Sequence, residues 1–212
     1  MSRRLVVLVA LLALAAPAAE AKGPPGSVSV CGARGLCVTV AGAEAQRLAL
    51  WDITREVAPA KPAPYYTVYF RWSDSARQET LYWLPTLGLA RTTTQAVARW
   101  YTVAEGGRGA VAARLAPTAP PRITRATVAG RRVRAPQTYL QLFRAGRKVS
   151  IFPAVNSWLP LRLHATVPSP WTDGSANLRI SSTGGYLLRD DTVFAIPGRL
   201  ADRARRGLPL TG

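Results

Sequence analysis

Hydrophobic and polar residues alternate along several segments of this chain. In the clearest one, 65–72, one face carries Tyr66, Val68, Phe70 and Trp72, and the other carries Tyr65, Thr67, Tyr69 and Arg71. In 161–167, Leu161, Leu163, Ala165 and Val167 alternate with Arg162, His164 and Thr166. A period of two residues is typical of strands that bury one face. Both segments are therefore predicted to be half-buried strands.

Shorter segments with a weaker pattern extend this prediction. Further strands are expected at 46–51, 80–84, 97–103, 123–128, 149–152, 177–181 and 193–196. Short helices are expected at 136–145, which Pro136 opens and Gly146 closes, and at 198–206, which Gly207 ends. The predicted fold is mainly β, an antiparallel sandwich or barrel-like domain with a few short helices. The pattern does not separate the sandwich from the barrel.

The N-terminal residues predict export. Arg3 and Arg4 precede an apolar run at 5–14, and Ala19-Glu20-Ala21 fits a signal peptidase site, so residues 1–21 are read as a signal peptide. The apolar run is too short to span about 30 Å of hydrocarbon, and no later segment of the sequence is long and apolar enough. We expect a secreted or extracellular protein in which 22–212 form a single mostly β domain. Two proline-rich segments, 58–64 and 116–121, are candidate subdomain breaks.

The two cysteines, Cys31 and Cys37, enclose five residues that include two glycines. An even number of cysteines in an exported chain suggests a disulfide bond. The flanks, 28–30 and 38–40, alternate valine with a small polar residue. A disulfide-closed hairpin is therefore predicted near the start of the mature chain.

The charge of the chain indicates an anionic partner. The formal net charge is +17, and no acidic residue lies between Glu105 and Asp173, an interval that holds eleven Arg and Lys. Such a charge favours association with polyanions, for example an envelope polymer, a phospholipid surface or an extracellular nucleic acid. Arginine richness with little lysine also follows from a GC-rich coding sequence, so the alternative is a purely compositional charge. The candidate polyanion-binding residues are Arg122, Arg125, Arg131, Arg132, Arg134, Arg147 and Lys148.

Aromatic residues are concentrated between residues 65 and 101, which hold nine of the 17 in the chain. Large aromatic side chains fill β cores, and they also form stacking platforms for sugars or bases. The alternation at 65–72 favours the core for half of this segment. Tyr65 and Tyr69 are the candidates for a binding face.

Catalytic signatures are sparse. His164 is the single histidine, and its position on the polar face of a predicted strand favours a solvated side chain over a general base. Asp190 and Asp191 are adjacent and indicate a turn. No P-loop, HExxH or Gly-x-Ser-x-Gly motif is present. We therefore expect no catalytic residues, no cofactor and no metal site. An exported hydrolase or carbohydrate-binding protein is the alternative to an anion-binding protein.

Two short patterns suggest a relationship. With Cys31-Gly32, Gly35 to Val40 and the 168–173 segment Pro-Ser-Pro-Trp-Thr-Asp, the chain resembles uncharacterised secreted proteins of high-GC Gram-positive bacteria. The resemblance implies export and no particular activity. Leu208 to Gly212 read LPLTG, similar to the LPxTG signal for cell-wall attachment. A working signal is followed by an apolar segment and a basic tail, so wall attachment through 208–212 is not expected.

Overall fold

The protein is described by a computed structural model that covers residues 24–49, 53–73, 78–93, 99–103, 108–172 and 178–210. The predicted signal peptide at 1–21 lies outside these residues. The first of two antiparallel sheets has the strand order β2-β1-β4-β5-β6-β7-β3. Its strands are β1 (Pro25–Cys31), β2 (Cys37–Ala41), β3 (Ile53–Val57), β4 (Tyr66–Trp72), β5 (Gln78–Leu84), β6 (Leu89–Thr92) and β7 (Trp100–Val103).

The second sheet has the order β10-β14-β13-β12-β11-β8-β9. Its strands are β8 (Ile123–Val128), β9 (Arg131–Arg132), β10 (Arg147–Lys148), β11 (Trp158–Ala165), β12 (Leu178–Ser181), β13 (Tyr186–Arg189) and β14 (Thr192–Ala195). The helices are α1 (Gly42–Ala49), α2 (Arg108–Ala112) and α3 (Gly198–Arg205), with 3₁₀ turns η1 (Ala33–Gly35), η2 (Pro85–Leu87) and η3 (Pro136–Phe143). No helix in the described parts of the chain is both long and apolar enough to cross a membrane.

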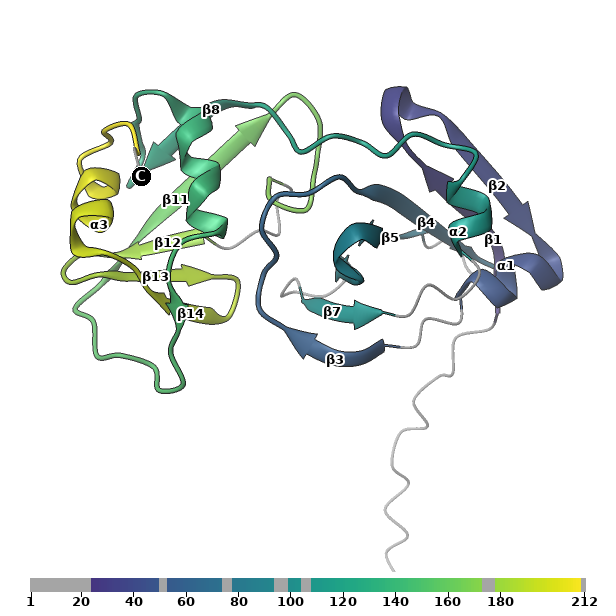
Figure 1. Ribbon diagram of the computed structural model, residues 1–212, viewed down its shortest axis with the longest axis horizontal. Coiled ribbons are helices and arrows are strands. Elements are labelled where there is room, and N and C mark those ends of the chain that lie inside the picture. The colour runs from purple at the N-terminus through teal and green to yellow at the C-terminus, as the bar shows by residue number, and fades with distance from the viewer. Residues whose placement is uncertain are drawn as a thin grey trace, which may run out of the picture.

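The two sheets lie in two lobes, which Figure 1 shows side by side. We call residues 24–116 the N-terminal lobe and residues 122–210 the C-terminal lobe. The prediction of a mainly β, antiparallel fold with a few short helices is confirmed, and neither sheet closes into a barrel. The 116–121 segment runs between the lobes, whereas 58–64 connects β3 to β4 within the first sheet. The single-domain organisation of 22–212 stays a prediction.

Two of the strand predictions were wrong. Residues 46–49 of the 46–51 segment belong to helix α1, in which Ala45 and Leu48 are buried three residues apart on one helical face, and residues 50 and 51 lie outside the described residues. The 149–152 segment belongs to the loop that follows β10. Pairing there stops at Lys148, although Val149 still donates a backbone hydrogen bond to Val193, at 3.0 Å.

The predicted hairpin forms at the edge of the first sheet. β1 pairs with β2 in a register that places Cys31 directly opposite Cys37, and the two are joined by a disulfide with Cα atoms 4.0 Å apart. The chain turns between them through Arg34 and Gly35, both at positive φ. The disulfide therefore links the two strands at the end of the hairpin next to the turn.

A cluster of aromatic side chains joins the two lobes. Trp171 is 1% exposed, and its ring centroid lies 5.9 Å from that of Tyr65 and 6.3 Å from that of Trp100. Its indole Nε1 donates a hydrogen bond to the carbonyl oxygen of Ala60, at 3.0 Å. These four residues bring together the first sheet, the 58–64 segment and the C-terminal lobe. We call Tyr65, Trp100 and Trp171 the aromatic joint.

Strand β5 has buried side chains on both of its faces, and this explains where the aromatic joint lies. Leu81 and Trp83 pack into a core inside the N-terminal lobe, against Val28, Val68 and Leu48. Tyr82 and Leu84 point the other way, into the core shared with the C-terminal lobe. The first sheet is therefore a middle layer at this point, with hydrophobic side chains on both faces.

Candidate functional site

Strand pairing in the C-terminal lobe brings arginines from separate parts of the sequence to one sheet face. Thr127 of β8 lies opposite Arg132 of β9 on one side and opposite Arg162 of β11 on the other. Residues paired in register point to the same face of a sheet. Arg132 and Arg162 therefore flank Thr127 in one cross-strand row. Both side chains are exposed, whereas Ala126, Val128, Leu161 and Leu163 on the opposite face are buried in the core.

A further row lies on each side of the first. Arg125 of β8 is opposite His164 of β11, and Arg179 of β12 is opposite Pro160 of β11. The two arginines are exposed and His164 is half-buried. Neighbouring strands are about 4.8 Å apart, and residues two apart along a strand are about 6.6 Å apart. We call Arg125, Arg132, Arg162 and Arg179 the basic face.

The seven predicted polyanion-binding residues are all exposed, but the sheet does not bring them all together. Arg122 and Arg125 belong to β8 or its start, and Arg131 and Arg132 form β9. Arg147 and Lys148 form β10, at the opposite edge of the sheet. Arg134 follows β9 and donates its backbone N–H to the carbonyl of Gly207, at 2.9 Å. Arg179 was not predicted because it lies outside the acid-free interval.

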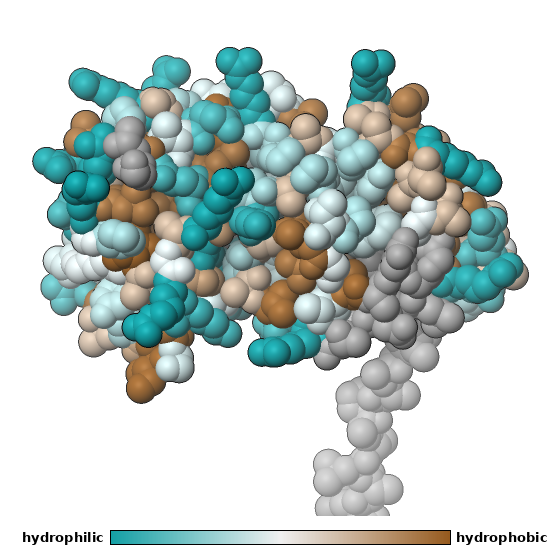
Figure 2. Space-filling view, in the orientation of Figure 1, coloured by the Kyte–Doolittle hydropathy of each residue, from teal (hydrophilic) through white to brown (hydrophobic). Residues whose placement is uncertain are grey.

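Charge is distributed unevenly between the lobes. Residues 122–210 contain 15 Arg and Lys against four Asp, a net charge of +11. Residues 24–116 contain ten Arg and Lys against six Asp and Glu, a net charge of +4. Hydrophilic side chains cover much of the C-terminal lobe in Figure 2, on the left of the view. The field that attracts an anion is therefore strongest around the lobe that carries the basic face.

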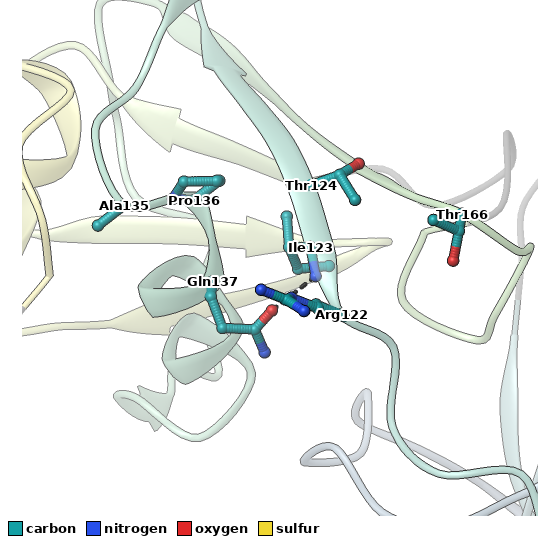
Figure 3. Close-up of a pocket in the computed structure, with 7 residues that line it drawn as sticks. All are labelled: Arg122, Ile123, Thr124, Ala135, Pro136, Gln137 and Thr166. Carbon is teal, nitrogen blue, oxygen red and sulfur yellow. Dashed lines mark hydrogen bonds between the residues drawn. The ribbon is translucent and has the colours of Figure 1, made fainter.

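An open cavity of about 530 Å³ lies next to the basic face, at the start of β8. Figure 3 shows its walls, with Thr166 on a separate loop from the others. Its lining is Arg122, Ile123, Thr124, Ala135, Pro136, Gln137 and Thr166. Gln137 accepts a hydrogen bond from the backbone N–H of Ile123, at 2.6 Å. The lining offers one cation and several hydroxyl or amide groups, and no carboxylate, imidazole or thiol.

The imidazole of His164 makes no hydrogen bond to a serine, cysteine or carboxylate among the described residues. Only its backbone carbonyl is used, as the acceptor for the Thr124 hydroxyl at 3.2 Å. The described residues also include no group of three or more His, Cys, Asp or Glu that could hold a metal ion. This geometry assigns His164 to the sheet surface beside Arg125.

Asp190 has a role that sequence analysis missed. The Asp190-Asp191 turn joins β13 to β14 as predicted, with Asp190 at a φ of 50°. Its carboxylate is buried and accepts a hydrogen bond from the Trp100 indole, at 3.1 Å. This bond links the C-terminal lobe to β7 of the N-terminal lobe. No pattern in the sequence pairs residues 90 positions apart.

Arg189 is buried next to Asp190. Its guanidinium carbon lies 3.2 Å from the ring centroid of Phe194, and Nη1 donates a hydrogen bond to the Leu142 carbonyl, at 2.8 Å. Burial lowers the pKa of Arg189 to about 10, and the negative charge of Asp190 opposes that shift. The carboxylate therefore offsets part of the cost of burying this cation.

The aromatic face predicted at Tyr65 does not exist there. Tyr65 is 1% exposed, belongs to the aromatic joint and donates its hydroxyl to the Pro168 carbonyl, at 3.3 Å. Burial, assisted by Tyr69, raises the pKa of Tyr65 to about 12. Tyr69 is half-buried on β4, between Ser29 and Thr80. The two tyrosines thus do not form one accessible platform.

Two buried tyrosines should make the fold sensitive to alkali. Burial also raises the pKa of Tyr139 to about 12, although Arg203 opposes the shift. An unfolded tyrosine ionises near pH 10, so between about pH 10 and 12 the unfolded state binds fewer protons and the free energy of unfolding falls. We expect a fall of up to about 1.4 kcal/mol per pH unit for each tyrosine. Urea unfolding from pH 9 to 11.5 should show a shallower fall for Tyr139→Phe than for the control Tyr186→Phe, and parallel curves would contradict this.

The LPLTG segment begins as part of the folded C-terminal lobe. Leu210 is 2% exposed, its N–H donates to the Thr138 hydroxyl at 3.0 Å, and its carbonyl accepts from Gln141. Arg203 donates to the Pro209 carbonyl through Nε, at 2.8 Å, and Nη2, at 2.6 Å. Thr211 and Gly212 lie outside the described residues. The described part of the motif is therefore tied to α3 and η3.

These observations define an exposed basic face on the C-terminal sheet, next to an open cavity without acidic groups. Comparison with protein-family models, with curated proteins and with solved structures finds no match to this chain.

Proposed function

We propose that the protein is a secreted or envelope-associated binding protein whose basic face holds an anionic polymer or surface. The predicted signal peptide at 1–21 supports export. The observation that carries the binding proposal is the register that aligns Arg132 and Arg162 across Thr127, with Arg125 in the row on one side and Arg179 in the row on the other. A charge set by composition alone would be similar on the two lobes, whereas here the net charge is +11 on the C-terminal lobe and +4 on the N-terminal lobe.

The chemistry of the face favours phosphate, sulfate or carboxylate groups repeated along a chain or surface. Guanidinium groups form bidentate hydrogen bonds with such anions. Strand spacing places the backbones of neighbouring arginines about 8 to 10 Å apart, which suits a partner with repeated charges better than a single small anion. Four arginines in these rows recognise charge and not the identity of a base or a sugar, so binding should depend on charge density and little on partner sequence.

The test is a triple substitution, Arg125→Gln, Arg132→Gln and Arg162→Gln, in the mature chain. The control is Arg47→Gln, Arg55→Gln and Arg71→Gln, which removes the same charge from exposed positions of the N-terminal lobe. At 0.1 M salt the basic-face variant should bind duplex DNA about tenfold or more weakly, because it neutralises fewer phosphates. It should also elute from heparin at lower salt.

Salt dependence distinguishes local ion pairing from the overall field. For duplex DNA, the slope of log K against log salt should become less negative by about 0.9 for each phosphate that the variant no longer neutralises. The control should change this slope little. Equal decreases in affinity for the two variants would show that only net charge matters, and the composition-based explanation would replace the proposed function.

A further inference from the structure

A hydrophobic tip protrudes from the C-terminal lobe in the loop between β10 and β11. Ile151 is 83% exposed and Phe152, the next residue, is 61% exposed. The other large hydrophobic side chains with high exposure among the described residues, Leu36 and Val167, are isolated from each other in the sequence. Figure 2 shows hydrophobic atoms at the end of a projection at the lower left of this lobe. Two adjacent exposed apolar residues at a tip are a feature the proposed function does not use.

The loop that carries the tip is anchored at both ends. At its start Val149 donates its backbone N–H to the Val193 carbonyl, at 3.0 Å. At its end the Ser157 carbonyl accepts from the backbone N–H of Ser182, at 2.9 Å. The Phe152 ring contacts the Trp158 ring edge-on, with centroids 5.9 Å apart. The tip is therefore held outward by the fold.

Three exposed cations precede the tip by a few residues along the chain. Arg147 and Lys148 form β10 and are both exposed, and Arg144 just before them is exposed as well. The sequence contains no acidic residue between residues 105 and 173. Hydrophobic side chains flanked by cations match the boundary of a bilayer, where anionic headgroups cover an apolar layer. We propose that Ile151 and Phe152 insert into an anionic phospholipid surface while Arg147 and Lys148 contact its headgroups.

Charge argues against the other occupants of this tip. A second copy would place Arg147 and Lys148 against another lobe of net charge +11, with repulsion between them. A soluble polyanion would use the cations but would leave Ile151 in water. Only a surface that is anionic outside and apolar beneath uses both kinds of side chain. This inference rests on the proposed function only in requiring an anionic partner, since it uses different residues.

The experiment is vesicle flotation of the mature chain on phosphatidylglycerol-containing and pure phosphatidylcholine vesicles. The wild type should float with the anionic vesicles only. Ile151→Ser with Phe152→Ser should lower the partition coefficient roughly tenfold or more, because two apolar side chains no longer enter the bilayer. The matched control, Leu36→Ser with Val167→Ser, removes two exposed apolar groups elsewhere and should float like the wild type. Arg147→Gln with Lys148→Gln should lower the coefficient about fivefold for each cation.

Heparin retention separates this inference from the proposed function. The Ile151→Ser, Phe152→Ser variant should elute from heparin with the wild type, because its charge is unchanged. If that variant still floated like the wild type, insertion of the tip would be refuted even if the basic face bound heparin as proposed. The inference would also be overturned if the wild type did not bind anionic vesicles, or if it dimerised through the tip in sedimentation experiments.

Discussion

Replacement of Trp171 by alanine should lower the free energy of unfolding by about 3–5 kcal/mol, the range for a fully buried large aromatic residue. The indole is 1% exposed and packs against Tyr65 and Trp100. The substitution would leave a cavity between the lobes and the Ala60 carbonyl without its donor. Urea unfolding followed by far-UV circular dichroism measures the decrease.

The control for Trp171 is Trp158→Ala, which removes a half-buried indole from the base of the tip loop. Its effect should be clearly smaller, because less apolar surface leaves the core. The Trp171 variant should also unfold over a broader range of urea, since the two lobes would be less strongly coupled. A decrease below about 1 kcal/mol for Trp171→Ala would show that the aromatic joint contributes little to stability.

Asp190→Asn should lower the free energy of unfolding by about 1.5–3 kcal/mol, the range for hydrogen bonds that involve a charged group. Asparagine keeps the size and an acceptor for the Trp100 indole, and it tolerates the positive φ at this position. The substitution therefore removes mainly the negative charge that offsets the buried Arg189. Thermal or urea unfolding at pH 7 measures the decrease in the free energy of unfolding.

The neighbouring carboxylate gives the matched control for Asp190. Asp191 is exposed in the same turn, so Asp191→Asn changes the net charge equally and should change stability by less than about 0.5 kcal/mol. Equal effects of the two substitutions would show that the Asp190 charge acts only through the overall field. The pairing of the Asp190 charge with the buried Arg189 would then add nothing specific to stability.

Strands that bury one face could be predicted from the sequence, and strands that bury two could not. β8 and β11 alternate because Arg125 and Arg162 face water while Ala126 and Leu163 face the core. In β5 the four residues 81–84 are all buried, since a core lies on each side, and no alternation remains. Helix α1 was missed because its burial repeats at three residues, a period hidden among small side chains.

The candidate site, too, could be predicted only in part from the sequence. The interval without acids lies mostly in the C-terminal lobe, which carries the larger net charge, and this much follows from composition. It did not identify the face, because neighbours across a sheet are set by register. Pairing brings Arg179 into the row next to Arg162, and strand order places Arg147 and Lys148 at the edge opposite β9. Ile151 and Phe152 were predicted only as part of a strand, and their exposure was not predicted.

The division of the two sheets along the chain sets an order in which the fold can form. Every strand of the first sheet lies within residues 25–103, and every strand of the second within residues 123–195. A chain that emerges from its N-terminus can therefore complete the first sheet before the second has been released. Until Trp171 has been synthesised, the side chains of β5 that pack into the shared core, and the ring of Trp100, are not covered by the C-terminal lobe. The partly synthesised chain is then most prone to aggregation, and packing of Trp171 ends the exposure of this apolar surface.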